Sequence, residues 1–296
     1  MSSKKYTLIF GFLAMVFASQ AQVAEWKDSS LIPPSRLAQH NEFVNNQYNF
    51  PAKPRSQWEV GVKLGSPSIN GDVDGLNPNF GVGLHVRKAL GYLVSIRGEL
   101  FTGTAKGLGS KENYNYVNNK AWFNNGYKPA TDKVFYNYKT KLTEASVQML
   151  FNLTNINFNK AEPKFALYAI AGVGVTMYQS NIDATNAGGA RYNFNSISSS
   201  LSKSETRSAL KALLDGTYET AGEGGKASAA SATVGLGAAF KISKRINLAI
   251  ENRVTVLSND LLDGQKWGPY PANNPSLSSN NDTYNFLSVG LNINIL

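Results

Sequence analysis

The chain has 296 residues, a formal net charge of +9 and no cysteine; 17% of its residues are charged and 26 are glycine. The absence of thiols excludes disulfides and cysteine-ligated metal sites. Many glycine, aromatic and amide residues with so few charges are typical of a transmembrane β-barrel rather than a soluble globular protein.

Residues 1–21 are predicted to be a secretory signal peptide. Lys4 and Lys5 give a basic start, residues 6–17 are apolar, and residues 19–21 end in small side chains at the cleavage site. The apolar segment is shorter than the roughly 20 residues that a spanning helix needs. We expect an exported protein that begins at Gln22, for which nucleic acid is not an expected partner.

Residues 22–56 contain Pro33, Pro34, Pro51 and Pro54 and show no hydrophobic period. We interpret them as an irregular periplasmic extension with one or two turns of helix over residues 37–44.

From Trp58 onward, eight segments alternate between apolar and small or polar residues, which is the period of β-strands. The fifth segment, residues 165–178, is apolar on both sides; its alternating glycines suggest that Val173, Val175 and Met177 face outward. Short connections are expected at residues 88–91, 152–164 and 241–245, and longer ones at 66–77, 104–138, 180–227 and 258–282. Short turns that alternate with long external loops predict an all-β fold, an eight-stranded antiparallel up-and-down transmembrane β-barrel over residues 57–296.

The last segment carries a further signal. Ser288, Gly290, Ile293 and Ile295 follow the order polar, glycine, apolar, apolar, which resembles the C-terminal signal for insertion of outer-membrane barrels. With its eight strands and glycine-rich inner faces, the chain is similar to the transmembrane barrel of the OmpA family. That resemblance implies the outer membrane of a Gram-negative bacterium, insertion by the barrel-assembly machinery, and contact with outer-membrane lipid and lipopolysaccharide, which the positive net charge suits. Many OmpA-like proteins also have a peptidoglycan-binding domain; we expect none here, so wall anchoring is not carried over.

Charged residues recur on the faces predicted to line the lumen. They are Glu59, Lys63, Arg87, Arg97, Glu99, Glu144, Lys241, Glu251 and Arg253. Charge inside so narrow a barrel is costly unless it is paired. We expect an ion-pair network that acts as a plug first and as a gate second.

The second long loop is rich in aromatic residues, among them Tyr114, Tyr116, Trp122, Phe123 and Tyr127. Exposed, they would stack on sugars or adhere to partners; packed together, they would stabilise the loop. In the third loop, residues 204–214 are predicted to be a short helix with Ser204 as N-cap, whose leucines cap the barrel mouth or contact a partner.

Catalytic and metal sites are not expected. The only histidines are His40 and His85, and no His/Ser/Asp constellation accompanies them. Residues 70–75 resemble a calcium loop, but position twelve is Gly81 instead of an acidic residue. We therefore expect no enzyme, metal or cofactor. The leading hypothesis is a structural, surface-interacting barrel; the alternative is a narrow porin-like channel for ions or small solutes.

Overall fold

The computed structural model describes residues 29, 32–48, 52, 58–91, 93–116, 118–129, 131–154, 165–243, 245–266 and 282–295. The predicted signal peptide and its cleavage site lie outside these residues.

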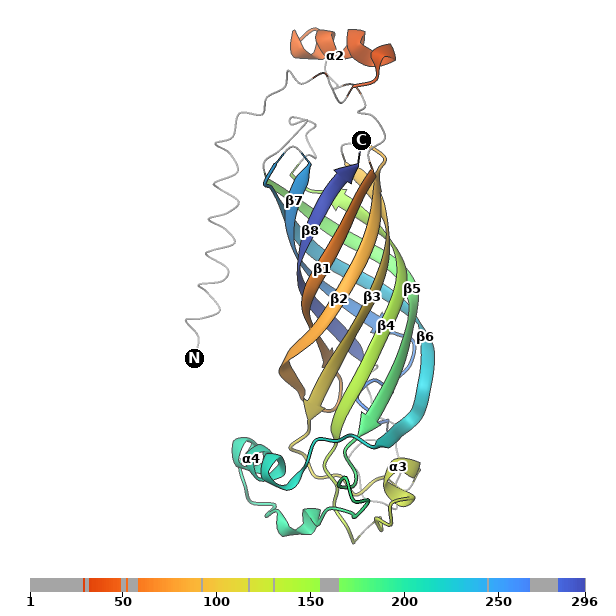
Figure 1. Ribbon diagram of the computed structural model, residues 1–296, viewed down its shortest axis with the longest axis vertical. Coiled ribbons are helices and arrows are strands. Elements are labelled where there is room, and N and C mark those ends of the chain that lie inside the picture. Colours follow the sequence, from red (N-terminus) through yellow and green to blue (C-terminus); the bar gives the residue numbers. More distant parts are fainter. Residues whose placement is uncertain are drawn as a thin grey trace.

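Eight strands form a closed barrel in which each strand pairs antiparallel with the next and β8 returns to β1 (Figure 1). The strands are β1 (Trp58–Asn70), β2 (Gly75–Ala89), β3 (Val94–Leu108), β4 (Asn137–Asn152), β5 (Phe165–Ile182), β6 (Thr220–Lys241), β7 (Ile246–Leu257) and β8 (Thr283–Ile295). The β1–β8 seam runs from the pair Trp58 and Ile295 to the pair Asn70 and Thr283. Closure removes the free sheet edges that lipid could not solvate, and it confirms the predicted fold class.

The polarity of this barrel is inverted relative to a soluble protein. Outward side chains in its middle are large, apolar and exposed; Leu100, for example, is 64% exposed and Val173 67%. Inward positions hold buried charged and polar residues such as Lys63 and Glu251. On β5, Val173, Val175 and Met177 all face outward, as the alternating glycines predicted.

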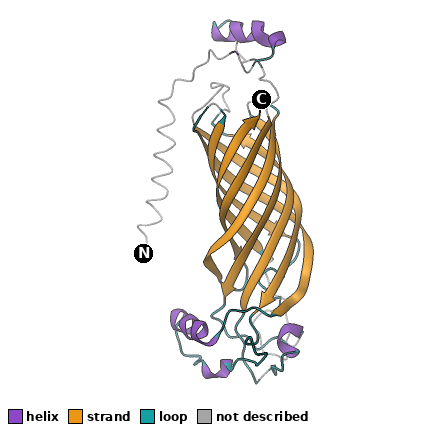
Figure 2. Ribbon diagram, in the orientation of Figure 1, coloured by secondary structure: helices purple, strands orange, loops and turns teal. Residues whose placement is uncertain are grey.

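The three longest connections lie at one barrel end, together with the short turn of residues 71–74. Residues 90–93, 153–164 and 242–245 join strands at the end where the chain's C-terminus lies (Figure 1). Residues 109–136, 183–219 and 258–282 join them at the other end. There the loops carry α3 (Lys120–Phe123), the 3-10 helix η4 (Phe194–Ser196) and α4 (Lys203–Leu213) (Figure 2).

The prediction of a long first loop over residues 66–77 is wrong. β1 continues to Asn70 and β2 begins at Gly75, so only residues 71–74 connect them. Beyond the apolar band the outward positions of β1 are polar, as at Ser66 and Ser68, so the hydrophobic alternation in the sequence ends there. The strand itself continues, because its pairing with β8 extends to Asn70. β6 likewise begins at Thr220, far earlier than its apolar pattern indicated.

The helices within the described residues are short. The predicted helix of the N-terminal extension is present as α2 (Leu37–Val44), after the 3-10 helix η3 (Pro34–Arg36). The N-cap of α4 is Ser202 rather than Ser204, because Ser202 and Glu205 form a reciprocal capping box. Among the described residues, no helix is long and apolar enough to span a membrane.

Candidate functional site

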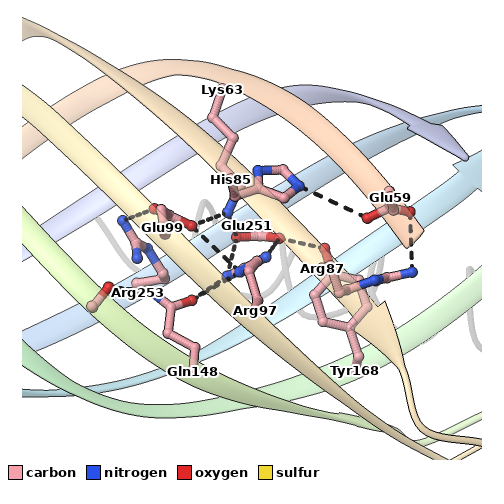
Figure 3. Close-up of polar contacts among 11 residues, drawn as sticks. Glu59, Lys63, His85, Arg87, Arg97, Glu99, Gln148, Tyr168, Glu251 and Arg253 are labelled. Carbon is pink, nitrogen blue, oxygen red and sulfur yellow. Dashed lines mark hydrogen bonds and ion pairs between the residues drawn. The ribbon is translucent and has the colours of Figure 1, made fainter. Parts of the chain in front are cut away.

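The middle of the lumen is filled by a charge network centred on two glutamates (Figure 3). Lys63 on β1 lies 2.7 Å from Glu99 on β3 and 2.6 Å from Glu251 on β7. Arg97 Nη1 lies 2.7 Å from Glu251 Oε1, and Arg253 Nη2 lies 2.7 Å from Glu99 Oε1. All five side chains are at most 1% exposed. The network therefore joins three strands across the barrel interior.

Neutral groups complete the network. Gln148 on β4 accepts a 2.9 Å hydrogen bond from Arg97 Nε, and the Tyr168 hydroxyl on β5 donates to Glu251 Oε1 at 2.6 Å. Glycine gives these large side chains room: a Cβ on Gly290 would lie 2.9 Å from Lys63 Cγ, and one on Gly237 would lie 2.4 Å from the Tyr168 ring. Glycines on the inner face thus leave the space that the large lumen side chains occupy.

Three other predicted lumen charges lie apart from this centre. Glu59 pairs with Arg87 at 3.1 Å, and His85 Nε2 lies 3.8 Å from Glu59 Oε1. Glu144 is buried and accepts a hydrogen bond from the Tyr284 hydroxyl.

Lys241, which we expected in the network, is the last residue of β6 and is only partly buried. The other eight predicted lumen charges are four acidic and four basic residues, so the interior is formally neutral.

Apolar side chains close the lumen between the network and the loops. Phe101, Tyr138, Leu142, Tyr284 and Phe286 point inward and are fully buried. The Phe101 ring centroid lies 4.5 Å from that of Phe286. Period-2 alternation alone does not distinguish such inward aromatics from a polar lumen lining, so the sequence analysis missed this layer.

The long loops pack into a folded cap over this layer, which we define as residues 71–74, 109–136, 183–219 and 258–266. Its centre is Trp122, which is fully buried with ring centroids 5.3 Å from Tyr127, 5.4 Å from Tyr136 and 6.0 Å from Phe194. Leu210 of α4 belongs to the same apolar cluster. The cap therefore has a core of its own that is continuous with the upper lumen.

Polar contacts tie the loops of the cap together. The Tyr127 hydroxyl donates to the Ala184 carbonyl at 2.8 Å, which links the loop of residues 109–136 (the second loop) to the loop of residues 183–219 (the third loop). Lys133 is buried; it pairs with Glu112 at 2.7 Å and donates to the Ile197 carbonyl. Asp74, in the β1–β2 turn, accepts ion pairs from Lys203 and Arg207 of the third loop at 2.8 and 2.9 Å.

The five predicted loop aromatics are divided between the core and the surface. Tyr116, Trp122 and Tyr127 are buried, so of the two alternatives the loop packs on itself at these positions. Tyr114 is half-buried, and Phe123 is 60% exposed. Leu213 and Leu214 pack against the edge of the apolar cluster.

Asp263 of the cap lies near Asp282, the residue directly before β8. Asp263 and Asp282 are both fully buried, and a Cβ on Gly71 would lie 2.0 Å from Asp282 Oδ1 and 2.6 Å from Asp263 Oδ2. Burial raises the pKa of each carboxyl above its ordinary range, and so does the neighbouring Asp260. The sequence analysis treated these residues as loop formers and did not bring them together.

The residues of the predicted insertion signal lie on the closing strand β8. Ser288 and Gly290 face the lumen, whereas Ile293 and Ile295 face outward and are about half exposed. Ile293 pairs with Val60 of β1 and with Ile246 of β7.

An apolar outer band, a polar interior and short turns opposite long loops define a membrane-spanning β-barrel. At the end with the turns, Trp58 faces outward with Lys88 Nζ 5.1 Å from its ring, as is usual at a membrane interface.

Solved structures of outer-membrane proteins are similar to this chain. A major outer membrane protein from Thermus thermophilus is 11% identical with a TM-score of 0.42, over 81% of this chain and 99% of that one. The attachment invasion locus protein Ail of Yersinia pestis is 10% identical with a TM-score of 0.37, over 81% and 97%. The outer membrane protease OmpT of Escherichia coli is 12% identical with a TM-score of 0.37, also over 81% and 97%. No family model and no curated protein sequence matches the chain.

Proposed function

We propose that this protein is a non-conducting outer-membrane β-barrel of the OmpA type, with a structural role, that displays a folded cap at the cell surface. The observation that carries this proposal is the succession of closures along the lumen. The charge network comes first, then the apolar layer around Phe101 and Phe286, and then the cap core around Trp122. An ion that entered the barrel would have to disrupt all three.

The orientation follows from the loops. In outer-membrane barrels the short turns face the periplasm and the long loops face outward, so the cap is external and α2 belongs to the periplasmic side. Insertion by the barrel-assembly machinery and lipopolysaccharide as the surrounding outer lipid follow from the same assignment. The exposed part of the cap, including Phe123, would contact surface partners.

Conductance in planar bilayers tests the closed lumen. The full chain is expected to give no steady current at neutral pH. Glu251→Gln, which removes an acceptor shared by Lys63 and Arg97, is expected to admit brief openings. A large, steady wild-type current would instead favour the narrow channel for ions or small solutes.

Labelling of intact cells tests the orientation. An epitope inserted between Gly188 and Gly189, in an exposed turn of the cap, should bind antibody on intact cells. The same epitope after Ser243, in the short β6–β7 turn, should bind only after permeabilisation. The reverse pattern would contradict an external cap.

A further inference from the structure

Four exposed lysines lie together on the outer surface of the barrel near the cap. They are Lys106 on β3, Lys139 and Lys141 on β4, and Lys226 on β6. Lys106 pairs directly with Lys139 in the strand register, whereas Lys141 pairs with Gln179 of β5 and Gln179 pairs with Lys226. Since neighbouring strands are about 4.8 Å apart, the four ammonium groups share one patch across four adjacent strands. We call it the lysine patch.

Little in the protein neutralises the lysine patch. Like charges directly opposite one another in a sheet are destabilising. Of the acidic residues on these four strands, Glu99 and Glu144 are buried in the lumen, β5 has none, and Glu223 of β6 is partly buried. The Lys106 and Lys139 ammonium groups lie 5.7 and 5.9 Å from the Tyr218 ring centroid, which leaves both charges in place. Within the described part of the chain, none of the four forms an ion pair.

The position of the lysine patch along the barrel axis indicates which part of the lipid it contacts. Two residues below Lys141 and Gln179 on the same outward face are Thr143 and Met177, and the apolar band follows with Val175. If the band lies in the acyl chains, the lysines are at the level of the lipid headgroups. In the proposed orientation these are the headgroups of the outer leaflet.

We infer that the lysine patch binds the phosphate groups of a phosphorylated glycolipid of the outer leaflet, whose acyl chains lie against the apolar band below. Lysine ammonium groups bind phosphate as point charges, so a row of them accommodates several phosphates without one fixed geometry. Lipid is the expected occupant because it is the continuous neighbour of this surface at headgroup height. The inference deepens the proposed function and depends on its orientation.

Binding of bisphosphorylated lipid A to the purified full chain in neutral detergent, measured by native mass spectrometry or titration, tests the inference. Because each basic residue near an anionic lipid surface contributes measurably to attraction, wild type should prefer this lipid over its dephosphorylated form by about tenfold or more. The quadruple variant Lys106→Gln, Lys139→Gln, Lys141→Gln and Lys226→Gln should lose that preference, and the four Lys→Arg changes should keep it. Lys88→Gln, at the opposite end of the barrel, is the matched control and should bind as wild type does.

Equal wild-type binding of the two lipids, or an unchanged preference in the glutamine variant, would overturn the inference. Heat-modifiable gel migration establishes that each variant is folded before binding is compared. The epitope experiment separates the two proposals. If the cap is labelled at the cell surface but the protein shows no preference for the phosphorylated lipid, the proposed function stands and the lysine-patch inference fails. If the protein prefers the phosphorylated lipid but the cap is periplasmic, the bound lipid cannot come from the outer leaflet.

Discussion

Arg97 on β3 and Glu251 on β7 form a buried ion pair across the lumen, with Arg97 Nη1 2.7 Å from Glu251 Oε1. Arg253, the neighbour of Glu251 on the same face of β7, pairs instead with Glu99, the neighbour of Arg97 on β3. Arg97 Nε also lies 3.4 Å from Glu99 within β3, and Lys63 binds both glutamates between the two strands. The barrel is held together across its interior as well as around its wall.

The balance of charge in this centre predicts an asymmetry between two substitutions. Glu251→Gln leaves Lys63, Arg97 and Arg253 with Glu99 alone, so uncompensated positive charge remains buried. Loss of one partner of a buried pair costs about 3–5 kcal/mol, and we expect a loss of stability of that order. Arg97→Gln leaves two basic and two acidic groups and should cost less. Unfolding in denaturant, followed by gel migration, measures both variants.

Arg87→Gln is the control, because its side chain is 25% exposed and water can replace part of its contact with Glu59. Its effect should be smaller than that of either central variant. Equal losses for Glu251→Gln and Arg87→Gln would contradict a coupled central network.

The facing of these residues was predictable from the sequence, but their pairing across the lumen was not. Strict alternation puts Arg97, Glu99, Glu251 and Arg253 on inward faces, and the structure agrees. Arg97 and Glu99, two apart on β3, do lie 3.4 Å from one another, but the pairs across the lumen are shorter. The partners that form depend on strand register and tilt around the closed barrel, which no local pattern encodes.

The cap was the least predictable part, because its loops have no period. Trp122 and Phe123 are adjacent and both aromatic, yet the first is fully buried and the second is exposed. Trp122 is selected by its ring contacts with Tyr127 of the same loop and with Phe194 of the loop of residues 183–219. The N-cap of α3, Asn119, also fixes the helix, because its side chain accepts a hydrogen bond from the Ala121 amide. These contacts are remote in sequence or depend on a helix of only four residues.

Replacing Ile293 and Ile295 with aspartate is expected to block assembly of the barrel. Both side chains face outward on the closing strand, where a charged residue in lipid costs up to a few kcal/mol according to depth. Folded, heat-modifiable protein should be absent from the outer-membrane fraction. Asn294→Asp, between them and facing the lumen side, is the control and should assemble. A folded band from the double variant would show that these positions do not contact lipid.

Trp122→Ala is expected to loosen the cap and spare the barrel. Truncation of a buried tryptophan costs about 3–5 kcal/mol, and Trp122 contacts aromatic rings from two loops. Limited proteolysis should cut within residues 109–136 and 183–219 while the barrel keeps its folded migration. Phe123→Ala, the exposed neighbour, should leave the cutting pattern unchanged. Cap loops that stay resistant in Trp122→Ala would mean that the aromatic cluster does not hold them.

The buried Asp263–Asp282 pair predicts that the cap weakens as pH rises. An aspartate in the unfolded chain has a pKa of about 3.9, whereas burial, with Asp263 and Asp260 nearby, raises the pKa of Asp282 to about 9. Between these values the folded cap binds more protons than the unfolded chain, so its stability falls with increasing pH. Hydrogen exchange of the cap amides, corrected for the intrinsic effect of pH on exchange, should show greater protection at pH 5 than at pH 9.

Asp282→Asn tests the origin of that pH dependence. In the wild type the Leu262 N–H donates to Asp282 Oδ2. The asparagine keeps an oxygen that can accept this hydrogen bond, and its amide carries no charge at any pH in this range. The variant should lose much of the difference in protection between pH 5 and pH 9. Asp215→Asn is the control, since this exposed carboxyl has a lowered pKa, about 2, owing to hydrogen bonds from Thr217 and Ala187, and it stays ionised throughout. If Asp282→Asn kept the wild-type difference in protection, titration of the buried pair would not be its cause.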